Sequence, residues 1–285
     1  MSEVAQLRKE EARIARELMA FTGKIARPTI YLFAGSLMAF VAAIVLVVLD
    51  IIPIWIATIS NTVMGYLLFT PMHEACHKNI AGKRRDLAGL ESLIGWISGL
   101  VILVPKPLFQ HLHNEHHKHT NNPEEDPDFW VASRNPLLII FKCLTIFFDY
   151  LYWFVKKRNI ILKDKNGKRD VLLTWLTLLL IAAIIVVSGE LFGYQYPLLL
   201  WIVPAWLALG LLAFAFDWLP HHPHSIKQRY LDTRIILKPG LTALLCSQNM
   251  HLIHHLYAGI PYYHYGNAYR TMKKHLVKRG ARIEE

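Results

Sequence analysis

The sequence is poor in cysteine and in charged residues. Its 285 residues include only three cysteines, Cys76, Cys143 and Cys246, which are too few and too far apart for a disulfide framework or an iron–sulfur site. Charged residues make up 18% of the chain and hydrophobic residues 54%, with a mean hydropathy of +0.29. This composition excludes a disordered protein and argues against an ordinary soluble enzyme. It favours an integral membrane protein.

Lysine and arginine are absent from four long apolar stretches. Each stretch has about 20 residues, the length that a helix needs to cross ~30 Å of hydrocarbon. The stretches cover residues 29–49, 54–72, 171–188 and 197–218. We therefore predict an all-α integral membrane protein with four transmembrane helices and a histidine-rich helical cap, formed by residues 73–170 and 219–285. Residues 1–285 are expected to form a single membrane domain, and the sequence contains no internal repeat.

The positive charges lie outside these stretches. All 31 lysines and arginines fall before the first stretch, between the second and third, or after the fourth, whereas the two short connections carry only Asp50 and Glu190 as charged residues. By the positive-inside rule, both termini and the cap are predicted to be cytoplasmic. This topology accounts for the net charge of +10. We therefore expect anionic lipid headgroups, and no nucleic acid, as partners of the basic segments.

Three segments outside the predicted spans are also partly apolar. Residues 1–28 contain no signal peptide and are expected to form an amphipathic surface helix. The side chains expected to face the bilayer are those of Leu7, Ile14, Leu18 and Phe21. Residues 87–104 and 136–155 contain charged residues, and two further crossings there would leave basic loops on the opposite side. We therefore predict re-entrant or interfacial helices in those two segments.

Histidine is the abundant residue type, with 15 copies. Most histidines occur in short clusters with helical spacing, so that members three or four residues apart share one helix face. The clusters contain His73 and His77; His113, His116 and His117; and His251, His254 and His255, while His221 follows the fourth apolar stretch. Neutral imidazole is a good ligand for first-row transition metals. Nine imidazoles are too many for one zinc ion and suit two metal ions with open positions for oxygen and substrate.

A local motif supports a different class of enzyme. His73-Glu-Ala-Cys-His77 matches the His-Glu-x-x-His pattern of zinc metalloproteases, in which Glu74 would be the general base. A membrane zinc metalloprotease is therefore a remote alternative, although it leaves both His-x-x-His-His clusters unexplained. A carboxylate-rich di-iron site is disfavoured, because it needs two Glu-x-x-His motifs and only the segment from Glu74 to His77 matches one. Single histidines such as His119, His264 and His275 are expected to be ordinary surface residues.

Taken together, the three clusters resemble the histidine boxes of the membrane fatty acid desaturase and hydroxylase superfamily. The resemblance extends from about the first apolar stretch to the C-terminal region. It implies that the eight clustered histidines, together with His221, ligate two iron ions that activate oxygen. In acyl-CoA desaturases an Asn-x-x-x-His segment stands where this sequence has Asp217-Trp-Leu-Pro-His221. The replacement of that asparagine by Asp217 is a departure from the pattern.

Within this superfamily the sequence is most similar to the ferredoxin-dependent β-carotene ring hydroxylases. The similar stretches are residues 73–77, 122–128, 216–224 and 248–256. This resemblance implies hydroxylation of a carotenoid ring, whereas desaturation of a fatty acyl lipid is the alternative because acyl-lipid desaturases carry similar boxes. The same ligands permit either reaction on a lipid-soluble substrate.

The sequence shows no cytochrome b5-like domain and no flavin or nucleotide fingerprint. Electrons are therefore expected from a separate protein, which the resemblance implies is a ferredoxin. The basic runs 83–85 and 156–158 would attract an acidic ferredoxin, but they could equally contact lipid headgroups.

Ligating imidazoles usually need a hydrogen-bond partner on the second ring nitrogen. Candidates for this role are Asp126, Asp128, Asp217 and His224, together with Glu115. Four aromatic residues are candidates either for lining a substrate channel or for anchoring at the membrane interface. They are Trp96, Phe109, Trp130 and Trp218.

Overall fold

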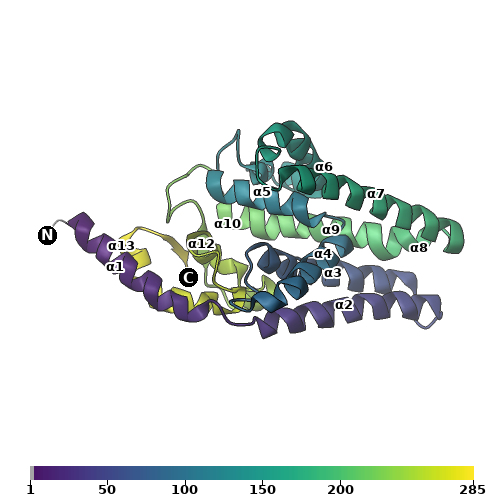
Figure 1. Cartoon of the computed structure of the whole chain (residues 1–285), viewed down its shortest axis with the longest axis horizontal. Coiled ribbons are helices and arrows are strands. Elements are labelled where there is room, and N and C mark those ends of the chain that lie inside the picture. Colours follow the sequence, from purple (N-terminus) through teal and green to yellow (C-terminus); the bar gives the residue numbers. More distant parts are fainter. Residues whose placement is uncertain (1–2) are drawn as a thin grey trace.

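The computed structural model describes residues 3–285, and its fold is almost entirely helical (Figure 1). The main helices are α1 (Glu3–Leu18), α2 (Arg27–Val48), α3 (Ile54–Cys76), α4 (Ala88–Val101), α5 (Lys106–His119), α6 (Pro136–Ile161), α7 (Gly167–Phe192), α9 (Val203–Leu212), α12 (His251–Leu256) and α13 (Tyr265–Lys278). Short elements are α8 (Gln195–Pro197), α10 (Leu219–His221), α11 (Leu241–Leu244) and the parallel pair β1 (Arg234–Ile236) and β2 (Arg282–Glu284). The predicted all-α membrane fold is confirmed.

The long helices lie side by side at one end of the molecule. In Figure 1, α2, α3, α7 and the rod that runs from α8 to α10 extend to one side, whereas α1, α12 and α13 gather at the other. The rod is one helix from Gln195 to His221 that includes two π-helical segments, Leu198–Ile202 and Ala213–Trp218. The second π-helical segment leads directly into His221 and so sets the direction in which that side chain leaves the rod.

Four helices are long and apolar enough to cross a membrane, and they only partly coincide with the predicted spans. They are Arg27–Val48, Pro136–Ile161, Gly167–Phe192 and Gln195–His221. The predicted second span forms α3, which packs along α2 but is not among these four. Its polar side chains are used inside the bundle, since Asn61 donates to the carbonyl oxygen of Leu200 at 2.8 Å and Thr58 to that of Leu199 at 2.8 Å.

The two apolar segments of the middle region differ from each other. Residues 136–155 lie within the uninterrupted 26-residue helix α6, so a re-entrant turn there is wrong, and the helix is long enough to span. Residues 87–104 form α4, which is followed by α5 after a bend of 96° near Pro105. This bent pair has the form expected of a broken span or a re-entrant segment.

The N-terminal helix is amphipathic, but its apolar face is covered by protein. Ile14 and Leu18 of α1 are 2% and 1% exposed and pack in one buried cluster with Met272 and Leu276 of α13. Their predicted orientation toward the bilayer is therefore wrong. An apolar stripe of helical period looks the same in a sequence whether lipid or another helix covers it. His275 is also buried in this region, contrary to its expected surface position.

Candidate metal centre

The nine clustered histidines converge from four helices. His73 and His77 lie at the end of α3, three histidines lie on α5, His221 ends α10, and the remaining three make up half of α12. Pro71 stands inside α3 one turn before the end, and α5 begins directly after the bend at Pro105. These breaks bring the ends of helices that are far apart in the sequence to one place between the apolar helices and the cap.

The first histidine group contains His73, His77, His113 and His254. One ligand atom from each lies within 4.8 Å of all the others. The Nε2 atoms of His73 and His254 are 3.1 Å apart, and those of His77 and His113 are 2.8 Å apart. His117 joins this group, since its Nε2 lies 2.8 Å from that of His254 and 3.1 Å from that of His113.

The second histidine group contains His116, His221, His251 and His255. Their ligand atoms also lie within 4.8 Å of one another. The Nε2 atoms of His116 and His255 are 3.2 Å apart. The ring centroid of His221 lies 4.7 Å from that of His116 and 5.0 Å from that of His251.

The two groups do not follow the sequence clusters. His113 and His117 belong to the first group but His116 belongs to the second, and His254 is separated in the same way from His251 and His255. The expectation that each triplet forms one patch is therefore wrong. Residues four apart on a helix differ by about 40° around its axis, whereas the third member points about 60° away on the other side. Both α5 and α12 thus supply imidazoles to both groups.

The donor set fits two metal ions. Two imidazole nitrogens bound about 2.0–2.1 Å from one metal ion, at a right angle, are separated by about 3 Å. Hydrogen bonds alone do not explain five converging Nε2 atoms, because a neutral imidazole carries only one N–H. Both ring nitrogens of His221 are buried and, among residues 3–285, have no hydrogen-bond partner. A metal ion at each group would bind one nitrogen of each imidazole, including one of the two on His221.

Several imidazoles have a partner on the ring nitrogen that faces away from the group. The Nδ1 of His116 lies 2.9 Å from Asp126 and 3.2 Å from Asp128. The Nδ1 of His254 lies 3.0 Å from the Tyr265 hydroxyl, and that of His251 lies 3.0 Å from the Gln248 side-chain oxygen. Such partners hold the ring orientation of metal-ligating histidines.

Tyr265 and Gln248 did not emerge from the sequence. Gln248 stands one helical turn before His251, a spacing that could have indicated it. Tyr265 begins a different helix, α13, and only the packing of α12 on α13 brings it to His254.

The protonation states favour ligation. Burial lowers the pKa of His251 to about 3 and holds those of His254 and His255 well below the ordinary value, so these imidazoles are neutral at pH 7. Burial also acts to lower the pKa of His116, but the carboxylates of Asp126 and Asp128 raise it to about 10. The proton on Nδ1 is thus held by the carboxylates, and a metal ion would replace the second proton, on Nε2.

The remaining predicted partners do not contact either group directly. Asp217 lies 3.3 Å from the Tyr150 hydroxyl, which donates a 2.7 Å hydrogen bond to Asp128. The ring of His224 lies 6.2 Å from that of His221, outside both groups. Glu115 pairs with Lys118 and, at 3.6 Å, with His119. Glu115 is therefore a surface carboxylate without the predicted role.

The number of histidines argues against a zinc protease. Glu74 itself is buried, and its Oε1 lies 3.5 Å from the side-chain nitrogen of Asn79. The first group also provides more imidazoles than a catalytic zinc site uses, and the second group would have no role. The geometry therefore disfavours the zinc protease alternative.

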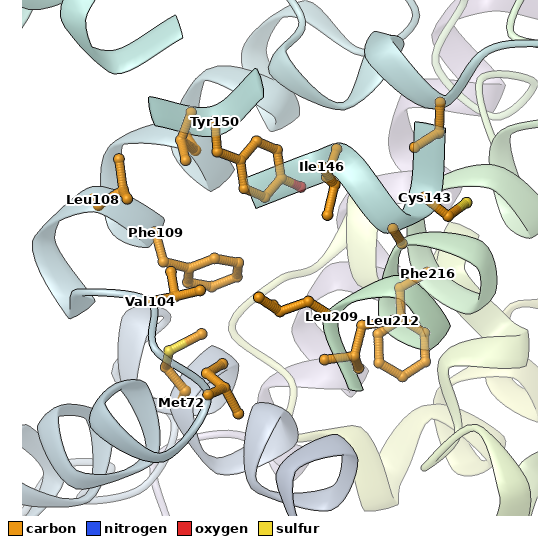
Figure 2. Packing of buried hydrophobic residues seen from close by; sticks show 14 of the residues in the cluster. Met72, Val104, Leu108, Phe109, Cys143, Ile146, Tyr150, Leu209, Leu212 and Phe216 are labelled. Carbon is orange, nitrogen blue, oxygen red and sulfur yellow. The ribbon is translucent and has the colours of Figure 1, made fainter. Parts of the chain in front are cut away.

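A narrow, mainly apolar cavity of about 40 Å³ reaches both groups. Its lining includes His73 and His113 of the first group and His116 and His251 of the second. Figure 2 shows Phe109 of α5, Tyr150 and Ile146 of α6, and Leu209 and Leu212 of α9 around one shared interior.

Of the four aromatic residues considered from the sequence, only Phe109 lines this cavity. The indole nitrogens of Trp130 and Trp218 donate instead to the carbonyl oxygens of Lys142 and Ser133, both at 3.0 Å. Trp96 is not part of the cavity lining either.

Comparison with known proteins agrees with this site. A family model described as fatty acid desaturase matches residues 49–285. The chain is 24% identical over 252 residues to an sn-1 oleoyl-lipid 12-desaturase of Picosynechococcus sp. (strain ATCC 27264 / PCC 7002 / PR-6), a match that covers 79% of this chain and 69% of the relative. It is 26% identical over 254 residues to a chloroplastic omega-3 fatty acid desaturase of Brassica napus, which covers 77% of this chain and 61% of the relative. The match thus spans less than two thirds of the plant protein.

Proposed function

Because the chain belongs to the fatty acid desaturase family, we propose that it is a membrane-bound di-iron oxidoreductase that introduces a double bond into the acyl chain of a lipid. The observation that carries this proposal is the cavity that reaches both histidine groups from among the apolar helices. Its mainly apolar lining suits the hydrocarbon part of a lipid beside both metal positions.

The predicted hydroxylation of a carotenoid ring has less support than its alternative, desaturation of a fatty acyl lipid. Both relatives described above are lipid desaturases by name. The ring at the end of a rigid polyene needs a broad, straight opening, whereas a flexible acyl chain fits a narrow passage. The cavity of about 40 Å³ is too small for either substrate as it stands, so the preference for an acyl lipid rests on the relatives.

The protein's own residues hold the metals and the substrate. The proposed ligands are His73, His77, His113, His117 and His254 for one iron, and His116, His221, His251 and His255 for the other. When bound, the two irons would supply the oxygen chemistry that removes hydrogen from an unactivated C–H bond. Asp126 and Asp128 hold the Nδ1 proton of His116, and the aromatic wall of Phe69, Phe109 and Phe216 excludes water from the reacting carbon atoms.

The reaction needs electrons from a separate protein, for which we propose a ferredoxin. We also propose that the histidine site and both termini face the cytoplasm, on the strength of the basic residues at both ends and in the middle region. Reporter tags at both termini and near Gly167 should then be cytoplasmic, and a tag near Gly193 should lie outside. A cytoplasmic tag near Gly193 would contradict this topology.

The decisive experiment is expression in cells that contain both β-carotene and unsaturated acyl lipids, with a ferredoxin supplied. Fatty acids and pigments are then analysed together. A new double bond in the acyl chains with unchanged pigment supports the proposal. Hydroxylated carotenoid with unchanged fatty acids would contradict the proposal and support a carotenoid hydroxylase. A His254→Ala variant is the matched control, since it should abolish either product.

A further inference from the structure

A strongly basic hollow lies apart from the metal site. It has a volume of about 630 Å³ and is formed where the end of α3, the following loop and the first turns of α4 and α5 meet. Its cationic lining residues are Lys78, Lys83, Arg84, Arg85 and Lys106. It shares no lining residue with the cavity at the histidine groups.

Few carboxylates neutralise these cations. Asp86 is bound by Arg84 through two hydrogen bonds of 2.8 and 2.6 Å. Glu91 is turned inward, where one of its oxygens accepts the backbone N–H groups of Ile80 and Ala81, both at 2.9 Å. Within the part of the chain that the structure describes, no carboxylate forms an ion pair with the other four cations of the hollow. The hollow is therefore positively charged before any ligand enters.

The basic loop is held in place by backbone contacts. The N–H of Ala26 donates to the carbonyl oxygen of Ile80 at 2.9 Å, and that of Lys83 donates to Gly23 at 3.0 Å. Gly82 has a φ of +59°, and a Cβ atom there would come within 2.6 Å of the Gly23 backbone. The loop thus approaches the start of α2 more closely than a larger residue allows. A ligand would meet cations whose backbone is already ordered, which lowers the entropic cost of binding.

The hollow lies where we expect the boundary between membrane and water. The loop is joined to the segment that leads into α2, an apolar helix long enough to span, which begins at Arg27. On α4, directly after the basic run, Leu90 and Leu93 are 39% and 54% exposed. Cations beside exposed leucines at the end of a membrane helix form a surface that is polar at one edge and apolar at the other.

We propose that this hollow binds the phosphate group of an anionic phospholipid, whose acyl chains lie along the exposed leucines of α4. Lysine and arginine are the usual partners of phosphate oxygens, and each basic residue near an anionic membrane surface contributes to attraction. The ammonium of Lys106 lies 3.4 Å from the Ser92 hydroxyl, so both can bind one oxyanion. The site is independent of the reaction proposed above, because its occupant need not be the substrate.

Lipid binding to the purified full-length protein tests this proposal. The variant Lys78→Gln/Arg85→Gln/Lys106→Gln removes three charges from the hollow. The control Lys156→Gln/Lys157→Gln/Arg158→Gln removes three charges from the other basic run, within α6. Each protein is titrated in detergent with phosphatidylglycerol or phosphatidylcholine, and retained lipid is measured by native mass spectrometry. Helix content and iron content serve as folding controls.

We expect the unsubstituted protein and the control to retain phosphatidylglycerol in preference to phosphatidylcholine. The hollow variant should bind phosphatidylglycerol at least about tenfold more weakly, since each removed cation weakens the attraction. If the triple variant folds poorly, the single exposed substitution Arg85→Glu should also weaken the binding of phosphatidylglycerol. Equal losses in both triple variants would show an effect of net charge alone and would overturn the proposal. Unchanged lipid binding in the hollow variant, with slower reduction by ferredoxin, would instead identify the hollow as the docking surface of the electron donor.

Discussion

The two histidine groups differ in what lies behind their imidazoles. In the second group, two carboxylates, Asp126 and Asp128, face the Nδ1 of His116. In the first group, His254 is backed by a neutral hydroxyl, that of Tyr265, and the Nδ1 of His73 is buried without a partner among the described residues. Hydrogen bonds to charged groups are roughly twice as strong as neutral ones. We therefore expect a metal ion to bind more tightly at the second position, whereas the first offers a fifth imidazole, that of His117.

The largest expected effect comes from removing one imidazole from either group. His116→Ala or His254→Ala should abolish activity and reduce the affinity for the corresponding iron by more than about 100-fold, because loss of an outer partner alone typically costs 10–100-fold. Elemental analysis should show about two irons in the unsubstituted protein and fewer in each variant. The protein should stay in the membrane, since the apolar helices do not depend on these rings. Full activity in either variant, or one zinc and no iron in the parent protein, would contradict the assignment.

The asymmetry between the groups is tested by Asp126→Asn. The amide keeps one acceptor oxygen for the Asp128 N–H and the His116 Nδ1, but it replaces the oxygen that accepts the Asn121 N–H and lacks the negative charge that faces His116. Affinity for the second iron should fall by about 10–100-fold, and the first iron should be retained. Iron titration followed by spectroscopy separates the two positions. Equal loss of both irons would show that the two groups do not bind independently.

A smaller effect is expected from Tyr265→Phe. This change removes the hydroxyl at 3.0 Å from His254 but keeps the ring in its buried position. The first iron should bind up to about tenfold more weakly, the low end for an outer partner. Asp126→Asn is the comparison, and a larger loss in Tyr265→Phe than in Asp126→Asn would reverse the proposed order of the two positions.

The smallest effect is expected from Glu74→Gln. Because Glu74 lies outside both groups, the variant should keep most of its desaturase activity and both irons. A zinc protease would lose nearly all activity on this change, since its general base would be gone. The desaturase assay with Asp126→Asn in parallel shows whether the carboxylate behind His116 matters more than the one beside His73.

Local spacing in the sequence was sufficient to find the ligand candidates but not to sort them. The i, i+3, i+4 pattern identifies His113, His116 and His117 as neighbours on one helix. It does not say that His116 turns toward His221 and His255 while the other two turn toward His254. That choice depends on where α10 and α12 come to lie beside α5. Tyr150 shows the same limit, because it approaches Asp128 from α6 without a motif of its own.

The apolar pattern likewise identified the fold class but not the surroundings of every helix. It correctly indicated a helical membrane protein, and three of its four stretches became helices of spanning length and hydropathy. It misjudged the surroundings of α1, whose apolar stripe packs on α13, and at 136–155 it left open a re-entrant turn where the structure has one uninterrupted helix. Hydropathy measures how much a segment gains by leaving water, and this gain is nearly the same in lipid and in a protein interior.

By itself, the sequence determined the class of the protein and the set of nine histidines, because helix periodicity and imidazole chemistry are properties of short segments. Only the tertiary structure decided how the histidines divide into two groups and which apolar side chains line the cavity beside them. These features join residues more than 100 positions apart, such as His117 and His254. They arise from the packing of whole helices, for which no short segment carries the information.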